Sequence, residues 1–111
     1  VFNNIPSFLG LKQTSQSITA DGSSTTAVDV TSAITEINAT SATHTCAMAD
    51  GSDGQIKIII NTSTSGTNAV AITPANFSNT SFTLNAPGET AVCVFKNSKW
   101  YVIGGNGFTI A

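Results

Sequence analysis

The side chains that could carry acid–base or metal chemistry are few in this sequence, and several of them lie between residues 44 and 54. His44 is the only histidine, and Cys46 follows it by two positions. In a β-strand, residues two apart point to the same face. Two ligands fall short of the three or four that a zinc site uses, so a packed or surface histidine is the simpler interpretation.

Two carboxylates, Asp50 and Asp53, follow in the segment Asp-Gly-Ser-Asp-Gly. The segment lacks the third acidic position and the terminal glutamate of a calcium-binding loop, so a turn between strands is favoured. A Ser–His–Asp arrangement would have to use His44, but no G-x-S-x-G motif accompanies it. We therefore expect no enzymatic activity, no metal site and no cofactor.

Trp100 and Tyr101 could stack on a sugar ring, as in a carbohydrate-binding module. Adjacent residues of a strand face opposite sides of a sheet, so these two rings cannot form one platform. Use in the core or in a subunit interface is favoured. A monomeric carbohydrate-binding β-sandwich stays open as an alternative, and it requires an exposed aromatic platform at Trp100 or Phe77.

Cys46 and Cys93 stand 47 positions apart. A disulfide between them would stabilise the fold by roughly 4 kcal/mol on the loop-entropy model. The other interpretation is two buried thiols that pack as small hydrophobic groups. Because the sequence shows no secretory signal, the buried thiols are favoured.

The composition points away from charged partners and toward β-structure. Charged residues make up 9% of the chain, with four lysines, no arginine and a net charge of −2. This is too little positive charge to bind nucleic acid or an anionic membrane surface. Ser, Thr and Asn together account for 40 of the 111 residues, and hydrophobic residues for 41%. Thr, Val, Ile and Phe fit half-buried strands, which predicts an all-β domain.

The elements that must position these residues are eight or nine short strands at roughly ten-residue spacing. The pattern predicts a small antiparallel β-sandwich or jelly-roll-like domain over residues 13–111. Between residues 26 and 37 we expect a strand with a break near residues 31–32, or else a short helix over 32–38. The strands are expected near residues 17–19, 26–37, 43–48, 55–61, 69–73, 81–85, 91–96, 99–103 and 108–111.

In the C-terminal part, two apolar runs separated by Asn97-Ser98 predict a hairpin over residues 91–103 with these two residues at its turn. The register would pair Phe95 with Trp100, and Gly-Gly-Asn-Gly after Ile103 would break the strand. Both faces of the hairpin are apolar, and one domain core covers only one of them. The second face is expected to pack against another copy, with an interface formed by Trp100, Tyr101, Val102, Ile103, Phe108 and Ile110.

The N-terminal residues 1–12 are expected to form an extended arm, because their apolar residues fit neither a helical nor a strand period. Five large apolar side chains are too many to leave in water, so the arm is expected to contact the capsid or another subunit. These residues are Phe2, Ile5, Phe8, Leu9 and Leu11.

Residues 54–107 resemble a segment of structural proteins of tailed bacteriophages, especially marine ones. The resemblance rests on the pattern GQIKIIINTS…NAVAITPANF…SFTLNAPGETAVCVFKNSKWYVIGGNG. The segment occurs in capsid decoration (cement) proteins and in the trimerising ends of tail spikes and fibres. It covers half of the chain.

The resemblance implies a trimeric β-structure on a virion. The first expectation is a decoration protein that binds the outer surface of a phage head as a homotrimer. It would contact the major capsid protein or neighbouring virion proteins and stabilise the shell. A trimeric tail spike or fibre domain is the alternative within the same resemblance.

Overall fold

The structure is a computed structural model, and it describes residues 12–23 and 26–111. Among these residues the chain forms ten strands and no helix. The strands are β1 (Ser15–Ala20), β2 (Ala27–Val28), β3 (Ile34–Ala39), β4 (His44–Met48), β5 (Ile56–Asn61), β6 (Val70–Pro74), β7 (Phe82–Leu84), β8 (Thr90–Lys96), β9 (Lys99–Asn106) and β10 (Thr109–Ile110).

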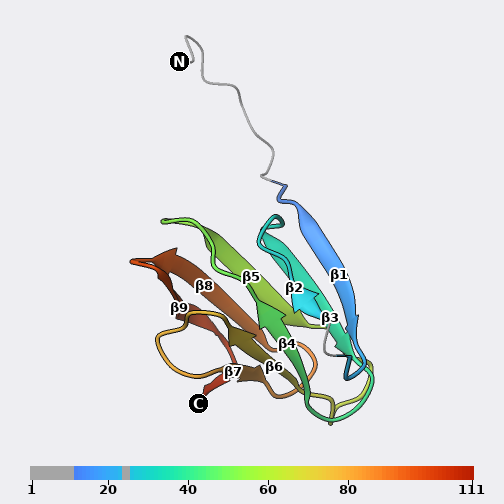
Figure 1. Cartoon of the computed structure of the whole chain (residues 1–111). Coiled ribbons are helices and arrows are strands. Elements are labelled where there is room, and N and C mark those ends of the chain that lie inside the picture. Colours follow the sequence, from blue (N-terminus) through green and yellow to red (C-terminus); the bar gives the residue numbers. More distant parts are fainter. Residues whose placement is uncertain (1–11, 24–25) are drawn as a thin grey trace.

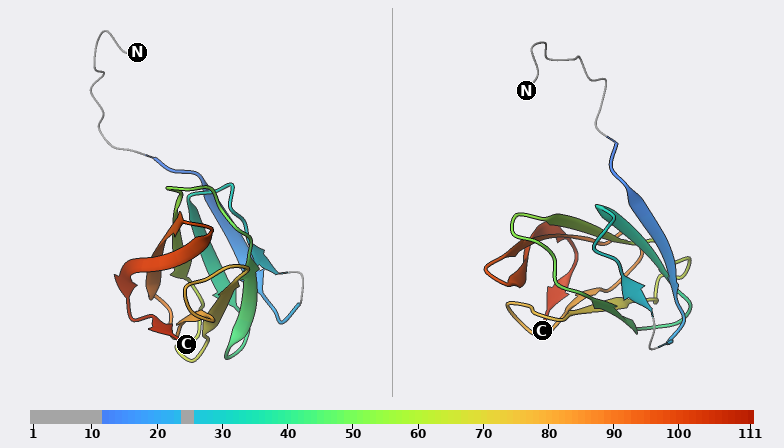
Figure 2. Two further views of the ribbon diagram at one scale, coloured as in Figure 1. Left: turned by 60° about the vertical axis from the view of Figure 1, so that its left-hand side comes forward. Right: turned by 45° about the horizontal axis from the view of Figure 1, so that its top comes forward.

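The strands form two five-stranded sheets that face each other across one core (Figures 1 and 2). One sheet, here called sheet A, has the order β1-β3-β5-β8-β9. The other, sheet B, has the order β10-β7-β6-β4-β2. The expectation of a small all-β sandwich is confirmed. The strand expected over residues 26–37 is present as β2 and β3 with a break between them, and the alternative of a short helix over residues 32–38 is wrong.

The sheets are mixed, whereas the sequence pattern predicted antiparallel pairing. From β1 to β6 the chain changes sheet at every connection, so neighbours within a sheet are two strands apart in the sequence and run in the same direction. The pairs β1–β3, β3–β5, β2–β4 and β4–β6 are therefore parallel. The pairs that involve β7, β8, β9 and β10 are antiparallel.

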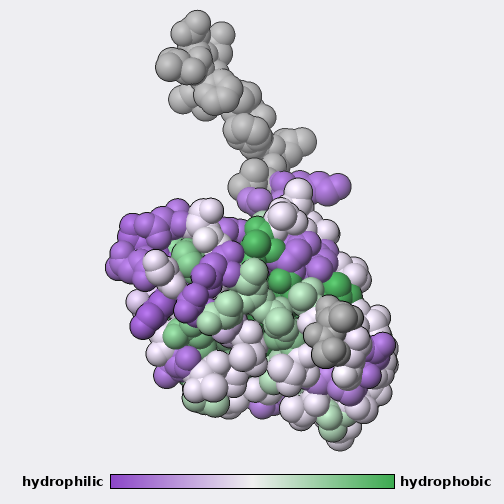
Figure 3. Space-filling view, viewed as in Figure 1, coloured by the Kyte–Doolittle hydropathy of each residue, from purple (hydrophilic) through white to green (hydrophobic). Residues whose placement is uncertain are grey.

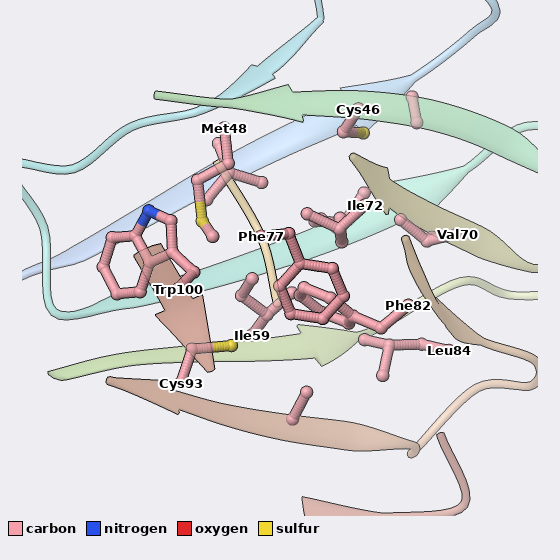
Figure 4. Packing of buried hydrophobic residues seen from close by; sticks show 14 of the residues in the cluster. Cys46, Met48, Ile59, Val70, Ile72, Phe77, Phe82, Leu84, Cys93 and Trp100 are labelled. Atoms are coloured by element: carbon pink, nitrogen blue, oxygen red, sulfur yellow. The ribbon is translucent and has the colours of Figure 1, made fainter. Parts of the chain in front are cut away.

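The core fills the space between the two sheets (Figure 4). Trp100 on β9 is fully buried, and its Nε1 donates a hydrogen bond to the carbonyl oxygen of Ala49 at 2.8 Å. The ring of Trp100 meets Phe95 edge-on at 5.2 Å between centroids. From sheet B the core receives Val28, Cys46, Met48, Val70, Ile72, Phe82 and Leu84.

The predicted hairpin is present, and β8 and β9 pair with Phe95 opposite Trp100 and Lys96 opposite Lys99. Its turn residues Asn97 and Ser98 both have positive φ, at 52° and 64°. Positive φ at both central residues is the geometry of a type I′ turn, whose twist matches the twist of paired strands. The like-charged lysines are tolerable because they are exposed and Lys96 contacts Asp53 at 3.3 Å.

We expect Ser98→Gly to stabilise the domain by about 0.5–1 kcal/mol, because glycine adopts positive φ without the Cβ penalty. Ser15→Gly in strand β1 is the control, and there the same change should lower stability by a similar amount. Chemical denaturation of both variants measures the effect. A Ser98→Gly variant that is less stable than the parent would contradict the type I′ assignment.

Strand β9 does not end at the glycines, contrary to the sequence-based expectation. It continues to Asn106, and the chain then passes to sheet B, where β10 pairs with β7. Gly105 has a φ of 136°, and a Cβ atom there would lie 2.2 Å from the carbonyl oxygen of Thr90. The glycine therefore lets β9 approach the start of β8 more closely than another residue could.

The N-terminal residues 1–11, with the predicted contact residues Phe2, Ile5, Phe8, Leu9 and Leu11, lie outside the described residues. Residue Lys12, the last of the predicted arm, is exposed.

In the view of Figure 3, strongly hydrophilic residues gather at the end of the sandwich where the tip of the β8–β9 hairpin lies in Figure 1.

Candidate functional site

The outward face of sheet A is apolar, although it is not part of the core. In β5, Lys57, Ile59 and Asn61 point into the sandwich and are buried. The alternate residues Ile56, Ile58 and Ile60 point outward, as the period of two requires. A strand with isoleucine on its solvent side departs from the usual polar-out alternation of a sheet with one wet face.

The strand register brings further apolar residues beside the isoleucines of β5. Ile34 of β3 and Val92 of β8 flank Ile58 on its two sides. Val94 of β8 stands between Ile56 and Tyr101 in the next row. With Ile103 on β9, these residues form a continuous surface over four strands, here called the apolar face: Ile34, Ile56, Ile58, Ile60, Val92, Val94, Tyr101 and Ile103.

The apolar face is accessible in the single chain. Ile103 is 60% exposed, Ile56 46% and Tyr101 37%, and the other five residues are half-buried by their neighbours. Covering such a face removes apolar area from water, which contributes about 25 cal/mol per Å². An apolar surface that spans several strands marks an interaction site more often than a solvated face.

Polar residues border the apolar face on two sides. On strand β1 the outward residues are Ser15, Ser17 and Thr19, and Ser17 donates a hydrogen bond to Glu36 of β3 at 2.8 Å. Lys96 and Lys99 stand beyond the row of Val94 and Tyr101. No charged side chain lies among the eight residues of the face. Exposed Glu36 on β3 is in register with Ile60 and borders the face there, so a partner that covers the other seven residues desolvates no ion.

The structure divides the six predicted interface residues among different places. Tyr101 and Ile103 lie on the apolar face. Val102 and Phe108 are half-buried against the core of their own chain. Ile110 is 45% exposed but lies on β10, in the other sheet.

Trp100 has no exposed surface that a second copy could contact, so it is removed from the proposed interface. The reason is the alternation along β9, which turns Trp100 inward and Tyr101 outward. Sequence reasoning missed the contributions of β3 and β5 to the face. The available signal was QIKIIIN, in which isoleucine occupies both alternating positions of one strand.

A buried ion pair lies on the opposite, inward side of β5. Lys57 is 0% exposed, and its Nζ donates to the carbonyl oxygen of Ser32 at 2.6 Å and contacts Asp29 Oδ1 at 3.3 Å. Burial lowers the pKa of Lys57, and the hydrogen bond and charge of Asp29 partly offset this. Burial alone would raise the pKa of Asp29, but the Ser32 amide and Lys57 outweigh it and the pKa is lowered. The pair ties the loop between β2 and β3 to sheet A.

The two cysteines are free and buried, on β4 and β8, as the favoured interpretation predicted (Figure 4). Burial raises the pKa of Cys46 to about 11 and that of Cys93 to about 12, with Lys57 opposing the rise at Cys93. Thiols in this state are poor nucleophiles, because the thiolate is the reactive form.

The other residues considered for chemistry are engaged in local structure. His44 Nε2 lies 2.9 Å from Ser41 Oγ and 3.2 Å from Thr40 Oγ1. Asp50 accepts a hydrogen bond from Asn76 at 2.8 Å, and Asp53 accepts one from the amide of Asn97 at 3.2 Å. No group of three potential metal ligands occurs within residues 12–23 and 26–111.

The aromatic platform that a carbohydrate-binding module would need is not formed by the residues proposed for it. Trp100 is fully buried, and Phe77 is 8% exposed and packs against Phe82 at 5.6 Å between ring centroids. Tyr101 is the one exposed aromatic residue in the part of the chain that the structure describes.

Comparison with protein families, with curated proteins and with solved structures gives no match to this chain. In the described ranges no helix is long and apolar enough to cross a membrane.

Proposed function

We propose that this protein is a virion structural protein of a tailed bacteriophage. In this proposal it binds the outer surface of the head as a homotrimer, contacts the major capsid protein and stabilises the shell. One structural observation carries the proposal: the apolar face of sheet A is uncharged and accessible in the single chain. The resemblance of residues 54–107 to a segment of tailed-bacteriophage structural proteins, in both decoration proteins and tail spikes or fibres, supports it from the sequence side.

In the proposed mechanism the protein acts by binding to the assembled shell. Each contact that covers the apolar face adds burial energy, and a protein that binds only the assembled shell stabilises it by mass action. Since the face holds no charge, its contacts are expected to persist in high salt, where exposed ion pairs are screened.

Within this proposal, we expect Ile103→Asp to weaken self-association by about 100-fold, because it places a carboxylate in an apolar contact. Ile103 is 60% exposed in the single chain, so the stability of the chain itself should change little. Thr19→Asp, on the exposed polar part of the same sheet face, is the matched control and should associate like the parent. Sedimentation at graded concentrations measures both. Equal association of parent and Ile103→Asp would exclude the apolar face as the interface.

The assignment to the capsid is tested by counting copies of the chain in purified particles by quantitative mass spectrometry. A decoration protein is expected at a copy number comparable to that of the major capsid protein. A few copies per particle would instead indicate the tail spike or fibre alternative. Absence of the chain from particles whose genome encodes it would contradict the virion proposal.

A further inference from the structure

We propose that the apolar face of each copy is covered by residues 1–11 of a neighbouring copy, so that the trimer is a ring of exchanged N-terminal segments. This inference rests on the proposed self-assembly and names the partner of the apolar face. Two surfaces on one chain lead to it, the outward face of sheet A and the apolar N-terminal segment.

The composition of the segment matches the surface it would cover. Residues 1–11 contain no charged side chain and five large apolar ones: Phe2, Ile5, Phe8, Leu9 and Leu11. The apolar face likewise has no charged residue and is built from isoleucine, valine and one tyrosine. Contact between the two along the rows of Ile56 and Ile58 removes apolar area on both sides and leaves no ion desolvated.

The segment begins at the correct end of sheet A. The backbone carbonyl of Thr14 accepts a hydrogen bond from the Ile34 amide at 3.0 Å, and Thr14 Oγ1 accepts one from Ala33 at 3.2 Å. Ser15, the next residue, is in register with Ile34, which belongs to a row of the apolar face. The N-terminal segment therefore joins the domain at the end of sheet A where this row of the apolar face lies.

The described residues before β1 continue in the direction of that strand. Residues 12–14 continue the line of β1 past the first residue of β3 (Figures 1 and 2). To cover its own apolar face the segment must turn across the strands of its own sheet, whereas a neighbour placed on the line of β1 receives the segment without that turn. This direction favours exchange between copies over covering within one chain.

The segment is long enough for this contact. Eleven extended residues span roughly 36 Å. The four strands of the apolar face are about 15 Å across, at about 4.8 Å between neighbouring strands. The segment can therefore leave one copy and still cross the face of the next.

Exchange also accounts for the odd number of subunits in the proposed assembly. Two identical faces that pack on each other form a two-fold dimer, while a ring of three needs two different surfaces that fit together. A donated segment and an accepting face are two such surfaces.

Disulfide trapping tests the exchange in the full chain. The double variant Leu9→Cys/Ile103→Cys is oxidised under mild conditions and separated without reductant. Cys46 and Cys93 are buried, so the introduced thiols are the accessible ones. The control Leu9→Cys/Thr19→Cys moves the acceptor to the polar strand β1, and circular dichroism verifies that both variants are folded.

We expect covalent dimers and trimers of the Ile103 variant at several times the yield of the control. A monomeric product with an internal disulfide would overturn exchange, because the segment would cover its own face. Failure to form either product, while the parent is a trimer, would overturn the segment as the partner and leave the proposed self-assembly intact. A monomeric parent would overturn both.

Discussion

Gly105→Ala is expected to destabilise the domain by about 3–5 kcal/mol, which combines the strain of a non-glycine residue at this φ with a clash that cannot relax. Gly105 has a φ of 136°, and its added Cβ would lie 2.2 Å from the Thr90 carbonyl oxygen and 2.9 Å from the Ala91 Cα. Both atoms belong to the backbone of β8, so no side chain can move aside. The pairing between β8 and the end of β9 must open instead.

Gly104→Ala is the matched control, one residue earlier on the same strand. Nothing lies within 4 Å of its Cβ position. Its effect on the free energy of unfolding is expected to stay within about 0.5 kcal/mol. Urea denaturation of the two variants gives the comparison. Similar stabilities would mean that β9 does not approach β8 as closely as described.

Asp29→Ala is expected to cost about 3 kcal/mol, the low end of the range for breaking a buried ion pair. The variant leaves the ammonium of Lys57 buried without its counter-charge, while Ser32 still accepts a hydrogen bond from it. The low end applies because the side chain of Asp29 is 34% exposed and water can partly replace it. Lys57→Met should change stability by only about 1 kcal/mol, since the remaining carboxylate can be hydrated. Equal losses in both variants would contradict this asymmetry.

The pH dependence follows from the same pair. Asp29 has a pKa below its ordinary 3.8, so it contributes stability above that pH and loses it as the pH falls through the folded-state value. Lys57 has a pKa below its ordinary 10.5, so stability rises as the pH increases through the window between its folded-state and ordinary pKa. Without Asp29 this window should extend to lower pH, so the stability deficit of Asp29→Ala relative to the parent should shrink as the pH rises through the window. Unfolding measured across this window tests the sign, and a constant deficit would contradict it.

The strands could be predicted where the sequence alternates or where a turn pair is diagnostic. β5 was expected from its isoleucines, and the β8–β9 hairpin was expected with its register, because Asn97-Ser98 separates two apolar runs by two residues. The parallel pairing could not be predicted from these local patterns. It depends on which sheet each connection enters, and the short loops between β1 and β6 carry no signal for that.

The apolar face could be predicted in part. Tyr101 and Ile103 were expected on an outward surface because both faces of the hairpin are apolar. The register of β3, β5 and β8 extends that surface to Ile34, Ile58 and Val92, and the sequence alone does not give this register. The sequence predicts Trp100 in the interface because the inner and outer faces of an isolated hairpin look alike in sequence. The burial of Trp100 in the folded domain shows which of the two faces is the inner one.

The most direct test of self-assembly through the apolar face is the native mass of the purified full chain, measured by light scattering in dilute buffer and in high salt. The chain mass is 11.3 kDa, and a homotrimer is expected at about 34 kDa in both conditions, because an uncharged apolar contact is not weakened by screening. A monodisperse particle of 11.3 kDa in both conditions would contradict self-assembly through this face.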